Sequence, residues 1–244
     1  MIYPQKNRFL QKLFSFYVLM ILKKHFAKLH LRGEEKIKNI INKYPIIFYM
    51  NHSCWWDPII VFYLSVIRWR LNGYAIMDIV QLKKYPFFSK FGTFSIDRNN
   101  ARSALKSIDF AAQILNNGNN AIWIFPQGEM LPSQYRPIRF YTGIARIINK
   151  TSKVQAIPIT FHYEFIEEQR PEIFISISEP IEFINPNFNH KLLTNKLLNI
   201  LVDDLELQKT NISNKKFDEY LEIIKGKTSI SNSFFNFRRK SVID

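Results

Sequence analysis

His52 and Asp57 lie five residues apart, where an apolar segment gives way to polar residues. The preceding residues 45–50, Pro-Ile-Ile-Phe-Tyr-Met, form a short uninterrupted apolar run, which is typical of a buried strand. Asp57 followed by Pro58 predicts the start of a helix, with the aspartate as N-cap and the proline in the first helical position. A neutral imidazole held by a carboxylate can serve as a general base. Taken alone, the pair is equally compatible with a polar loop residue beside a helix cap.

Two further polar clusters follow predicted strands. Residues 92–98, Gly-Thr-Phe-Ser-Ile-Asp-Arg, predict a strand that ends in a charged pair, and the apolar run 121–125 leads directly into residues 126–129, Pro-Gln-Gly-Glu. Ligands of open α/β sheets bind at the carboxyl ends of the strands. We therefore expect all three clusters to converge on one site.

These segments form an ordered set of four blocks, and the set resembles the glycerolipid (lysophosphatidate-type) acyltransferase family. The first block, Asn-His-x4-Asp at 51–57, matches fully. The second, at 92–98, matches at its glycine and its final Asp-Arg, and the fourth is the Ile-Pro-Ile of 157–159. The third, Phe-Pro-Gln-Gly-Glu-Met at 125–130, matches in part. The resemblance covers roughly residues 45–160, and four blocks in order are far more specific than one.

The resemblance implies an O-acyltransferase in which His52 removes a proton from an acceptor hydroxyl and Asp57 orients the imidazole. The nucleophile belongs to the substrate, so no enzyme serine is needed, and we expect Cys54 to be a packing residue. Backbone amides around Gly128 are the expected oxyanion donors, and Arg98 is the expected phosphate ligand. We expect neither a metal nor a cofactor; the acyl donor is acyl-CoA or an acyl carrier protein. The predicted substrate-binding residues are Asn51, Ser53, Arg98, Pro126, Gln127, Gly128, Glu129, Arg136 and Arg139.

The third block departs from the family pattern in a way that concerns the acceptor. Gln127 replaces the usual glutamate, and Glu129-Met130 replace the usual Thr-Arg pair, so a permanent positive charge is missing. Arg136 or Arg139 in the following loop is one replacement for this charge. The alternative is an acceptor without that phosphate, such as a glycolipid or a pigment glycoside.

Composition favours an anionic partner. The 244 residues carry a net charge of +14, and residues 1–40 contain nine Lys/Arg against two Glu, which gives +7 in a sixth of the chain. Nucleic acid is not expected, because no recognised nucleic-acid motif accompanies the charge. The single cysteine excludes an intramolecular disulfide and a cysteine-based zinc site.

Residues 5–30 predict a helix whose centre, 13–22, is apolar on all sides and has lysines at both ends. Ten helical residues span only about 15 Å, half of a bilayer's hydrocarbon core. A helix embedded in one leaflet fits this pattern, with its lysines at the headgroups, and a buried core helix is the alternative. We therefore expect a peripheral or monotopic protein on an anionic membrane surface, at the cytoplasmic face.

Strands alternate with helices in the rest of the chain, which predicts an α/β fold with a mixed, largely parallel sheet flanked by helices. The expected organisation is an N-terminal membrane-associated helical segment (1–32), an acyltransferase α/β domain (33–224) and a basic aromatic tail (225–244). The tail cluster at 234–240 is either a second membrane contact or a frayed end. A non-enzymatic basic binding protein and a hydrolase remain as other functions, the latter without a Gly-x-Ser-x-Gly elbow.

Overall fold

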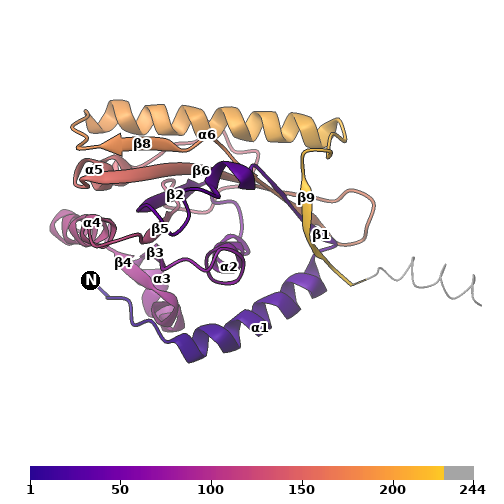
Figure 1. Ribbon diagram of the computed structural model, residues 1–244, viewed down its shortest axis with the longest axis horizontal. Coiled ribbons are helices and arrows are strands. Elements are labelled where there is room, and N and C mark those ends of the chain that lie inside the picture. Colours follow the sequence, from indigo (N-terminus) through magenta and orange to yellow (C-terminus); the bar gives the residue numbers. More distant parts are fainter. Residues whose placement is uncertain (228–244) are drawn as a thin grey trace, which may run out of the picture.

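The computed structural model describes residues 1–227, which form a mixed sheet with helices on both faces (Figure 1). The sheet order is β4-β3-β5-β2-β6-β7-β1-β9, and β8 pairs with β6 beside the end of β7. Strands β4, β3, β5, β2 and β6 are mutually parallel, whereas β7 is antiparallel to β6. The predicted α/β class with a largely parallel sheet is therefore confirmed. The strands are β1 Lys28–Arg32, β2 Ile46–Met50, β3 Gly73–Asp78, β4 Thr93–Ile96, β5 Ala121–Ile124, β6 Lys153–Glu164, β7 Glu172–Ile177, β8 Ile181–Ile184 and β9 Leu221–Lys225.

Helices cover the two faces of the sheet in two groups. Helices α4, α5 and α6 pack on one face, and α1 and α2 pack on the other (Figure 1). Side chains of the central strand β2 point alternately to the two faces of the sheet, so this strand contributes to both cores. Phe48 and Met50 join the core under α1 and α2, and Ile47 and Tyr49 join the core under α4–α6. The helices are α1 Arg8–His25, α2 Asp57–Phe62, α3 Ile79–Lys84, α4 Ala101–Asn116, α5 Gly143–Asn149 and α6 His190–Ser213, with short segments η1 Glu34–Ile37, η2 Tyr63–Arg68 and η3 Pro86–Phe91.

The start of α2 differs from the prediction. Trp56 is the N-cap, so Asp57 occupies the first helical position and Pro58 the second. The Asp57 carboxylate turns back to accept the amide protons of the preceding loop, instead of capping the helix from outside. By contrast, α4 begins with a conventional side-chain cap, because the Asn100 side chain accepts a 3.0 Å hydrogen bond from Ser103 N.

The predicted helix over 5–30 is too long. Helix α1 ends at His25, and residues 28–32 form β1, which pairs in parallel with β7 and antiparallel with β9. The sequence Lys-Leu-His-Leu-Arg alternates polar and apolar residues, but Leu29, His30 and Leu31 are all buried in the sheet, and five residues beside a strong helix are too few to reveal a strand. Residues 28–32 therefore belong to the sheet, and β9 spans the predicted boundary at 224. The aromatic and basic cluster at 234–240 lies outside the described residues.

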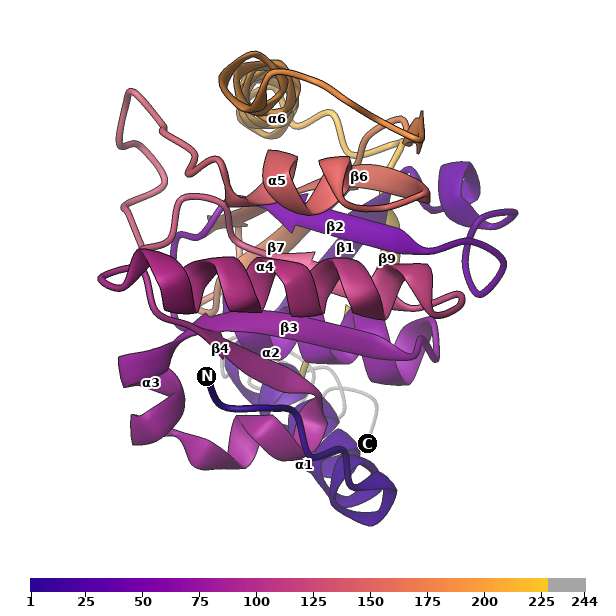
Figure 2. The same cartoon turned by 90° about the vertical axis from the view of Figure 1, so that its left-hand side faces the viewer.

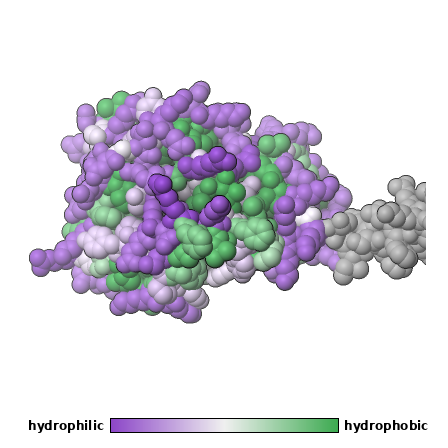
Figure 3. All heavy atoms as spheres, turned by 60° about the horizontal axis from the view of Figure 1, so that its bottom comes forward, coloured by the Kyte–Doolittle hydropathy of each residue, from purple (hydrophilic) through white to green (hydrophobic). Residues whose placement is uncertain are grey.

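Helix α1 is apolar on two opposite faces, which explains its uniform sequence. Its inner face buries Val18 and Leu22 completely, and Phe14 stacks on Phe91 with ring centroids 4.5 Å apart. The outer face comes forward in Figure 3, where hydrophobic side chains gather among hydrophilic ones. None of the helices in residues 1–227 is long and apolar enough to cross a membrane. The apolar residues exposed on the outer face are Phe9, Leu13, Phe16, Tyr17 and Met20.

Residues 1–7, here called the N-terminal strap, fasten the start of α1 to the edge of the sheet. Ser95 of β4 donates its amide to Ile2 O at 3.0 Å and accepts the Ile2 amide through Oγ at 2.7 Å. Asn7 N donates to Lys90 O at 2.9 Å, immediately before β4. The chain therefore starts beside β4, as Figure 2 shows.

Candidate active site

A histidine–aspartate pair lies at the carboxyl end of β2, the central strand. His52 Nδ1 is 2.8 Å from Asp57 Oδ2, and the aspartate side chain is completely buried. Because Asp57 heads α2 while His52 follows β2, the short loop between them forces the two side chains together. The contact predicted from their spacing is thus present in the structure.

The buried Asp57 carboxylate is surrounded by hydrogen-bond donors. Its Oδ2 also accepts the amides of Ser53 at 2.7 Å and Cys54 at 3.0 Å. Its Oδ1 accepts the hydroxyl of Tyr163, from β6, at 2.6 Å. A carboxylate buried without donors would be costly, and these donors hold the ionised form in one orientation.

His52 is held from three sides and is open at one atom. Its ring stacks on Phe125 with centroids 4.2 Å apart, and its own amide donates to Gln127 Oε1 at 2.8 Å. Nδ1 is engaged by Asp57, whereas no residue of the described chain contacts Nε2 by a hydrogen bond. With 16% of the side chain exposed, Nε2 is the ring atom available to a substrate proton.

The second and third sequence blocks meet beside this histidine. Gly128 follows Gln127 and adopts a left-handed conformation with φ +74°. The Arg98 guanidinium lies against the Gly128 α-carbon, in space that any Cβ would occupy, and Tyr141 lies on the same side. A glycine is required here both by its backbone angle and by this close approach. Gln127 therefore contacts His52, and Arg98 contacts the neighbouring Gly128, so the loops that follow β2, β4 and β5 meet at one edge of the sheet, as predicted.

Arg98 retains a guanidinium that is only loosely neutralised. Its Nε and Nη2 are each 3.4 Å from Asp78 Oδ2, which is long for a charge-assisted hydrogen bond. Its carbon centre is 5.4 Å from the centroid of the Tyr141 ring. Its partner is Asp78 at the end of β3, and no ion pair with Asp97 is formed.

Asn51 and Ser53 differ in how they are used. The Asn51 side chain forms two hydrogen bonds to the backbone of Phe161, at 2.8 and 2.9 Å, and so ties the end of β2 to β6. Both polar atoms of this buried amide serve the scaffold. Ser53 Oγ is buried and has no hydrogen-bond partner in the described chain.

The other predicted substrate ligands are spread along the loop before α5. Pro126 is buried and accepts the Tyr141 amide at 2.9 Å through its carbonyl, whereas Glu129 is exposed. Arg136 points to α6, where it forms an ion pair with Glu206, and it also donates to the carbonyls of Ser133 and Tyr135. Arg136 is therefore committed to the scaffold.

Arg139 is the free cation of this loop: it is exposed and makes no ion pair or hydrogen bond with the described residues. Of the two arginines that could replace the missing charge of the third block, it alone is uncommitted. Its guanidinium is therefore available to an anionic ligand.

Cys54 lies beside Asp57 but is not an activated nucleophile. Burial and the neighbouring carboxylate raise the pKa of its thiol to about 11. The thiolate required for covalent catalysis is accordingly scarce at neutral pH.

Sequence reasoning missed three residues of the site. Tyr163 contacts Asp57, Phe125 supports the His52 ring, and Tyr141 packs beside Arg98. Phe125 opens the third block, so its nearness to His52 was recoverable from the block order. Tyr163 had no local signal, because it lies 106 residues from its partner.

Comparison with known proteins agrees with this site. A family model described as Acyltransferase matches residues 28–162, more than half of the chain. The fold is similar to the crystal structure of the 1-acyl-sn-glycerophosphate (LPA) acyltransferase PlsC from Thermotoga maritima, with a TM-score of 0.55. Sequence identity is 18%, over 82% of this chain and 83% of that one. Comparison with curated protein sequences gives no significant match.

Proposed function

Because the chain belongs to the acyltransferase family and is an acyltransferase, we propose that it moves a fatty acyl group from acyl-CoA or an acyl carrier protein to a hydroxyl of a lysophospholipid such as 1-acylglycerol-3-phosphate. The observation that carries the proposal is the His52–Asp57 pair with an unengaged Nε2. A proton acceptor at the end of a central strand, with no activated enzyme nucleophile beside it, suits transfer to a substrate hydroxyl.

In the proposed reaction, His52 Nε2 takes the proton of the acceptor hydroxyl as its oxygen attacks the thioester carbonyl. Asp57 keeps the Nδ1 proton in place and stabilises the imidazolium that forms. The tetrahedral intermediate collapses, the carbon–sulfur bond breaks, and the thiolate leaves with the proton that His52 returns. The products are an ester and a free thiol, and His52 is neutral again.

The oxyanion of the intermediate needs donors close to Gly128. The Gly128 amide itself donates to Phe125 O at 3.0 Å, so it is an unsuitable donor as it stands. The next amide, of Glu129, has no acceptor in the described chain. We propose that this amide and the Arg98 guanidinium stabilise the oxyanion or the adjacent phosphate.

A neutral acceptor is a second candidate, and a specific observation favours it. Met130 stands where relatives carry an arginine, and Arg136 is paired with Glu206. Phosphate recognition then depends on Arg98 and Arg139. A sugar-bearing lipid alcohol needs neither cation.

We also propose that the enzyme is a peripheral or monotopic protein of the cytoplasmic membrane face. Support comes from the outer face of α1, where Phe9 is 75% and Phe16 is 74% exposed. Lys12, Lys23 and Lys24 of the same helix are exposed as well. Apolar side chains flanked by lysines match an anionic lipid interface, which also supplies the lipid acceptor.

The test of the catalytic proposal is thiol release from acyl-CoA with His52→Ala. We expect loss of acceptor-dependent release, whereas His190→Ala, a histidine at the start of α6, retains it. Unchanged transfer by His52→Ala contradicts the proposal. Acceptor-independent release that His52 supports would instead identify a thioesterase.

A second assay separates the two acceptors. Lysophosphatidate and a neutral monoacylated glycolipid are compared with wild type and with Arg98→Ala and Arg139→Ala. We expect each arginine variant to raise KM for lysophosphatidate while leaving KM for the glycolipid unchanged. Turnover of the glycolipid alone by wild type selects the neutral acceptor.

A further inference from the structure

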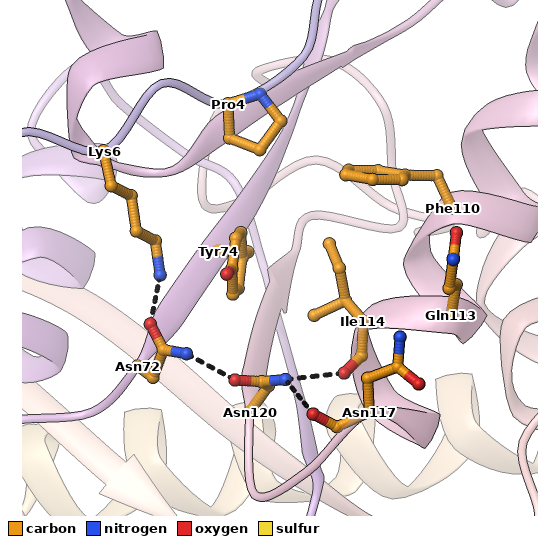
Figure 4. A pocket seen from close by; sticks show the side chains of 9 residues that line it. All are labelled: Pro4, Lys6, Asn72, Tyr74, Phe110, Gln113, Ile114, Asn117 and Asn120. Atoms are coloured by element: carbon orange, nitrogen blue, oxygen red, sulfur yellow. Dashed lines mark hydrogen bonds between the residues drawn. The ribbon is translucent and has the colours of Figure 1, made fainter.

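A cavity of about 470 Å³ lies at the edge of the sheet opposite to His52 (Figure 4). Its walls come from the amino ends of β3 and β5, the second half of α4 and the N-terminal strap. The catalytic pair follows the carboxyl end of β2, a parallel neighbour of β5. A strand of four or five residues puts the two regions about 15 Å apart, so the cavity is separate from the candidate active site.

The cavity contains one cation and no counter-charge. Lys6 extends from the strap, donates to Asn72 Oδ1 at 2.6 Å, and has its Nζ 3.4 Å from the centroid of the Tyr74 ring. No carboxylate lines the cavity, and no ion pair joins Lys6 to an acid in residues 1–227. Burial lowers the pKa of Lys6 to about 7. Asn72 and Tyr74 both favour the charged amine, but it lacks an anionic partner among the residues that line the cavity.

Neutral amides complete the polar lining in two functional sets. Asn72 donates to Asn120 Oδ1 at 2.5 Å, and Asn120 in turn donates to Ile114 O at 2.7 Å, which aligns the acceptor that holds Lys6. The side-chain amides of Gln113 and Asn117, across the cavity from Lys6, have no partner in the described chain (Figure 4). Both residues are exposed, so a ligand can accept from their amides in place of water.

The backbone near Lys6 is adapted to the position of its ammonium group. Gly92 has φ +100°, and a Cβ at this position would lie 2.7 Å from Lys6 Cε. The absence of a side chain lets the Lys6 stem cross to Tyr74. Gly92, the glycine of the second sequence block, therefore lies beside both the Lys6 stem and the Gly73 carbonyl.

We propose that this cavity binds a small organic monoanion, a carboxylate attached to a short apolar or aromatic body. The carboxylate supplies the missing charge next to Lys6 and accepts from the free amides, while Phe110, Pro4 and Ile114 provide apolar walls. One cation matches one negative charge and leaves a phosphate dianion under-compensated. The volume lies within the range of small-molecule sites.

The ligand would affect the N-terminal strap. Lys6 lies two residues before α1, so a bound anion links the strap to β3 and α4 around the cavity. Ligand binding therefore stabilises the attachment of α1 to the sheet, at a distance from the chemistry.

The test is isothermal titration calorimetry of the full chain with benzoate and hexanoate at pH 7.5, in two buffers of different ionisation enthalpy. We expect binding with proton uptake, because the anion restores the charged form of Lys6. Lys6→Met should weaken binding by roughly 10- to 100-fold, as expected for loss of a hydrogen bond to a charged group. Lys216→Met, which removes an exposed lysine elsewhere, should leave it unchanged.

Gln113→Leu is a second test variant, needed because Lys6→Met could weaken binding simply by disturbing the folding of the strap. This variant keeps Lys6 and should weaken binding by roughly tenfold, with an unchanged melting temperature. The proposal is overturned if neither carboxylate binds with a Kd below about 10 mM, which is roughly tenfold weaker than the millimolar affinity expected of such small ligands. It is also overturned by equal affinity of Lys6→Met, or by stronger binding of neutral benzamide or inorganic phosphate than of benzoate.

Discussion

The Tyr163 hydroxyl donates a 2.6 Å hydrogen bond to Oδ1 of Asp57, on the opposite carboxylate oxygen from the one that holds His52. Tyr163 lies near the end of β6, so the longest strand of the sheet supports the loop that follows β2. Burial and the Asp57 charge raise the pKa of Tyr163 well above its ordinary value, which keeps the hydroxyl protonated and able to donate. Tyr163 is thus a positioning residue for the pair.

Tyr163→Phe removes this donor and keeps the ring. We expect kcat to fall roughly fivefold with little change in KM, because about 1 kcal/mol of orienting interaction is lost from the chemical step. The carboxylate also becomes a stronger acceptor toward the imidazolium, so the acidic limb of the pH–rate profile moves to higher pH. Steady-state kinetics across pH measures both effects. A purely structural role would instead lower stability and leave the profile in place; Tyr135→Phe, an exposed tyrosine, is the control.

Gly128→Ala and Gly118→Ala form a matched pair. Both glycines have positive φ, +74° and +115°, so alanine costs each roughly 1–2 kcal/mol of stability. At Gly118 the new Cβ meets nothing within 4 Å, whereas at Gly128 it meets the Arg98 guanidinium. We expect similar losses in urea unfolding but a loss of acyl transfer only in Gly128→Ala. If Gly128→Ala and Gly118→Ala are equally active, the position of Arg98 against Gly128 is not needed for acyl transfer.

Phe9→Ser with Phe16→Ser tests the outer face of α1. Each exposed phenylalanine contributes roughly 1.5–3 kcal/mol when it enters an apolar phase, so the double variant should bind anionic vesicles at least about tenfold more weakly. Flotation with phosphatidylglycerol-containing liposomes measures this. Leu192→Ser, on α6 across the sheet and 71% exposed, should bind as wild type does. If the double variant floats equally well, α1 is not the lipid contact.

Lys6 gives the stability a defined pH dependence. Its pKa is about 7 in the folded chain and 10.5 in the unfolded chain, so the unfolded chain holds more protons between these values. Stability therefore rises with pH across this window and receives no further change from Lys6 below about pH 7. Lys6→Met should flatten this slope, measured as free energy of unfolding in urea between pH 6 and 10. If Lys6→Met has the same slope as wild type and as the control Lys216→Met, Lys6 is not the source of the pH dependence.

The His52–Asp57 contact was predictable because its geometry is local. A buried strand, a six-residue loop and a helix start leave His52 and Asp57 few ways to avoid each other. The convergence of Arg98 and Gly128 was also expected, since parallel strands carry their following loops to one edge. Local spacing and the rule for strand ends were sufficient for these residues.

Other features depend on contacts between distant segments. Arg136 is paired with Glu206, 70 residues away, and no pattern around either residue indicates the other. Strand β1 was not predicted because Lys28–Arg32 directly follows a long helical segment in the sequence. Its strand conformation depends on pairing with β7 and β9, which lie far away in the chain. The burial of only one face of α1 likewise depends on distant residues, because Phe62 and Phe91 pack against that face.

Helix α1 crosses the sheet from one side to the other. The strap holds its start next to β4, and its end passes directly into β1, six strand spacings away in the sheet order. Eighteen residues of helix measure about 27 Å, and six spacings of about 4.8 Å measure about 29 Å, so the helix fits this width. With both ends anchored, α1 cannot pivot independently. On a bilayer it would fix the tilt of the whole enzyme, and hence the depth below the headgroups at which His52 meets its substrate.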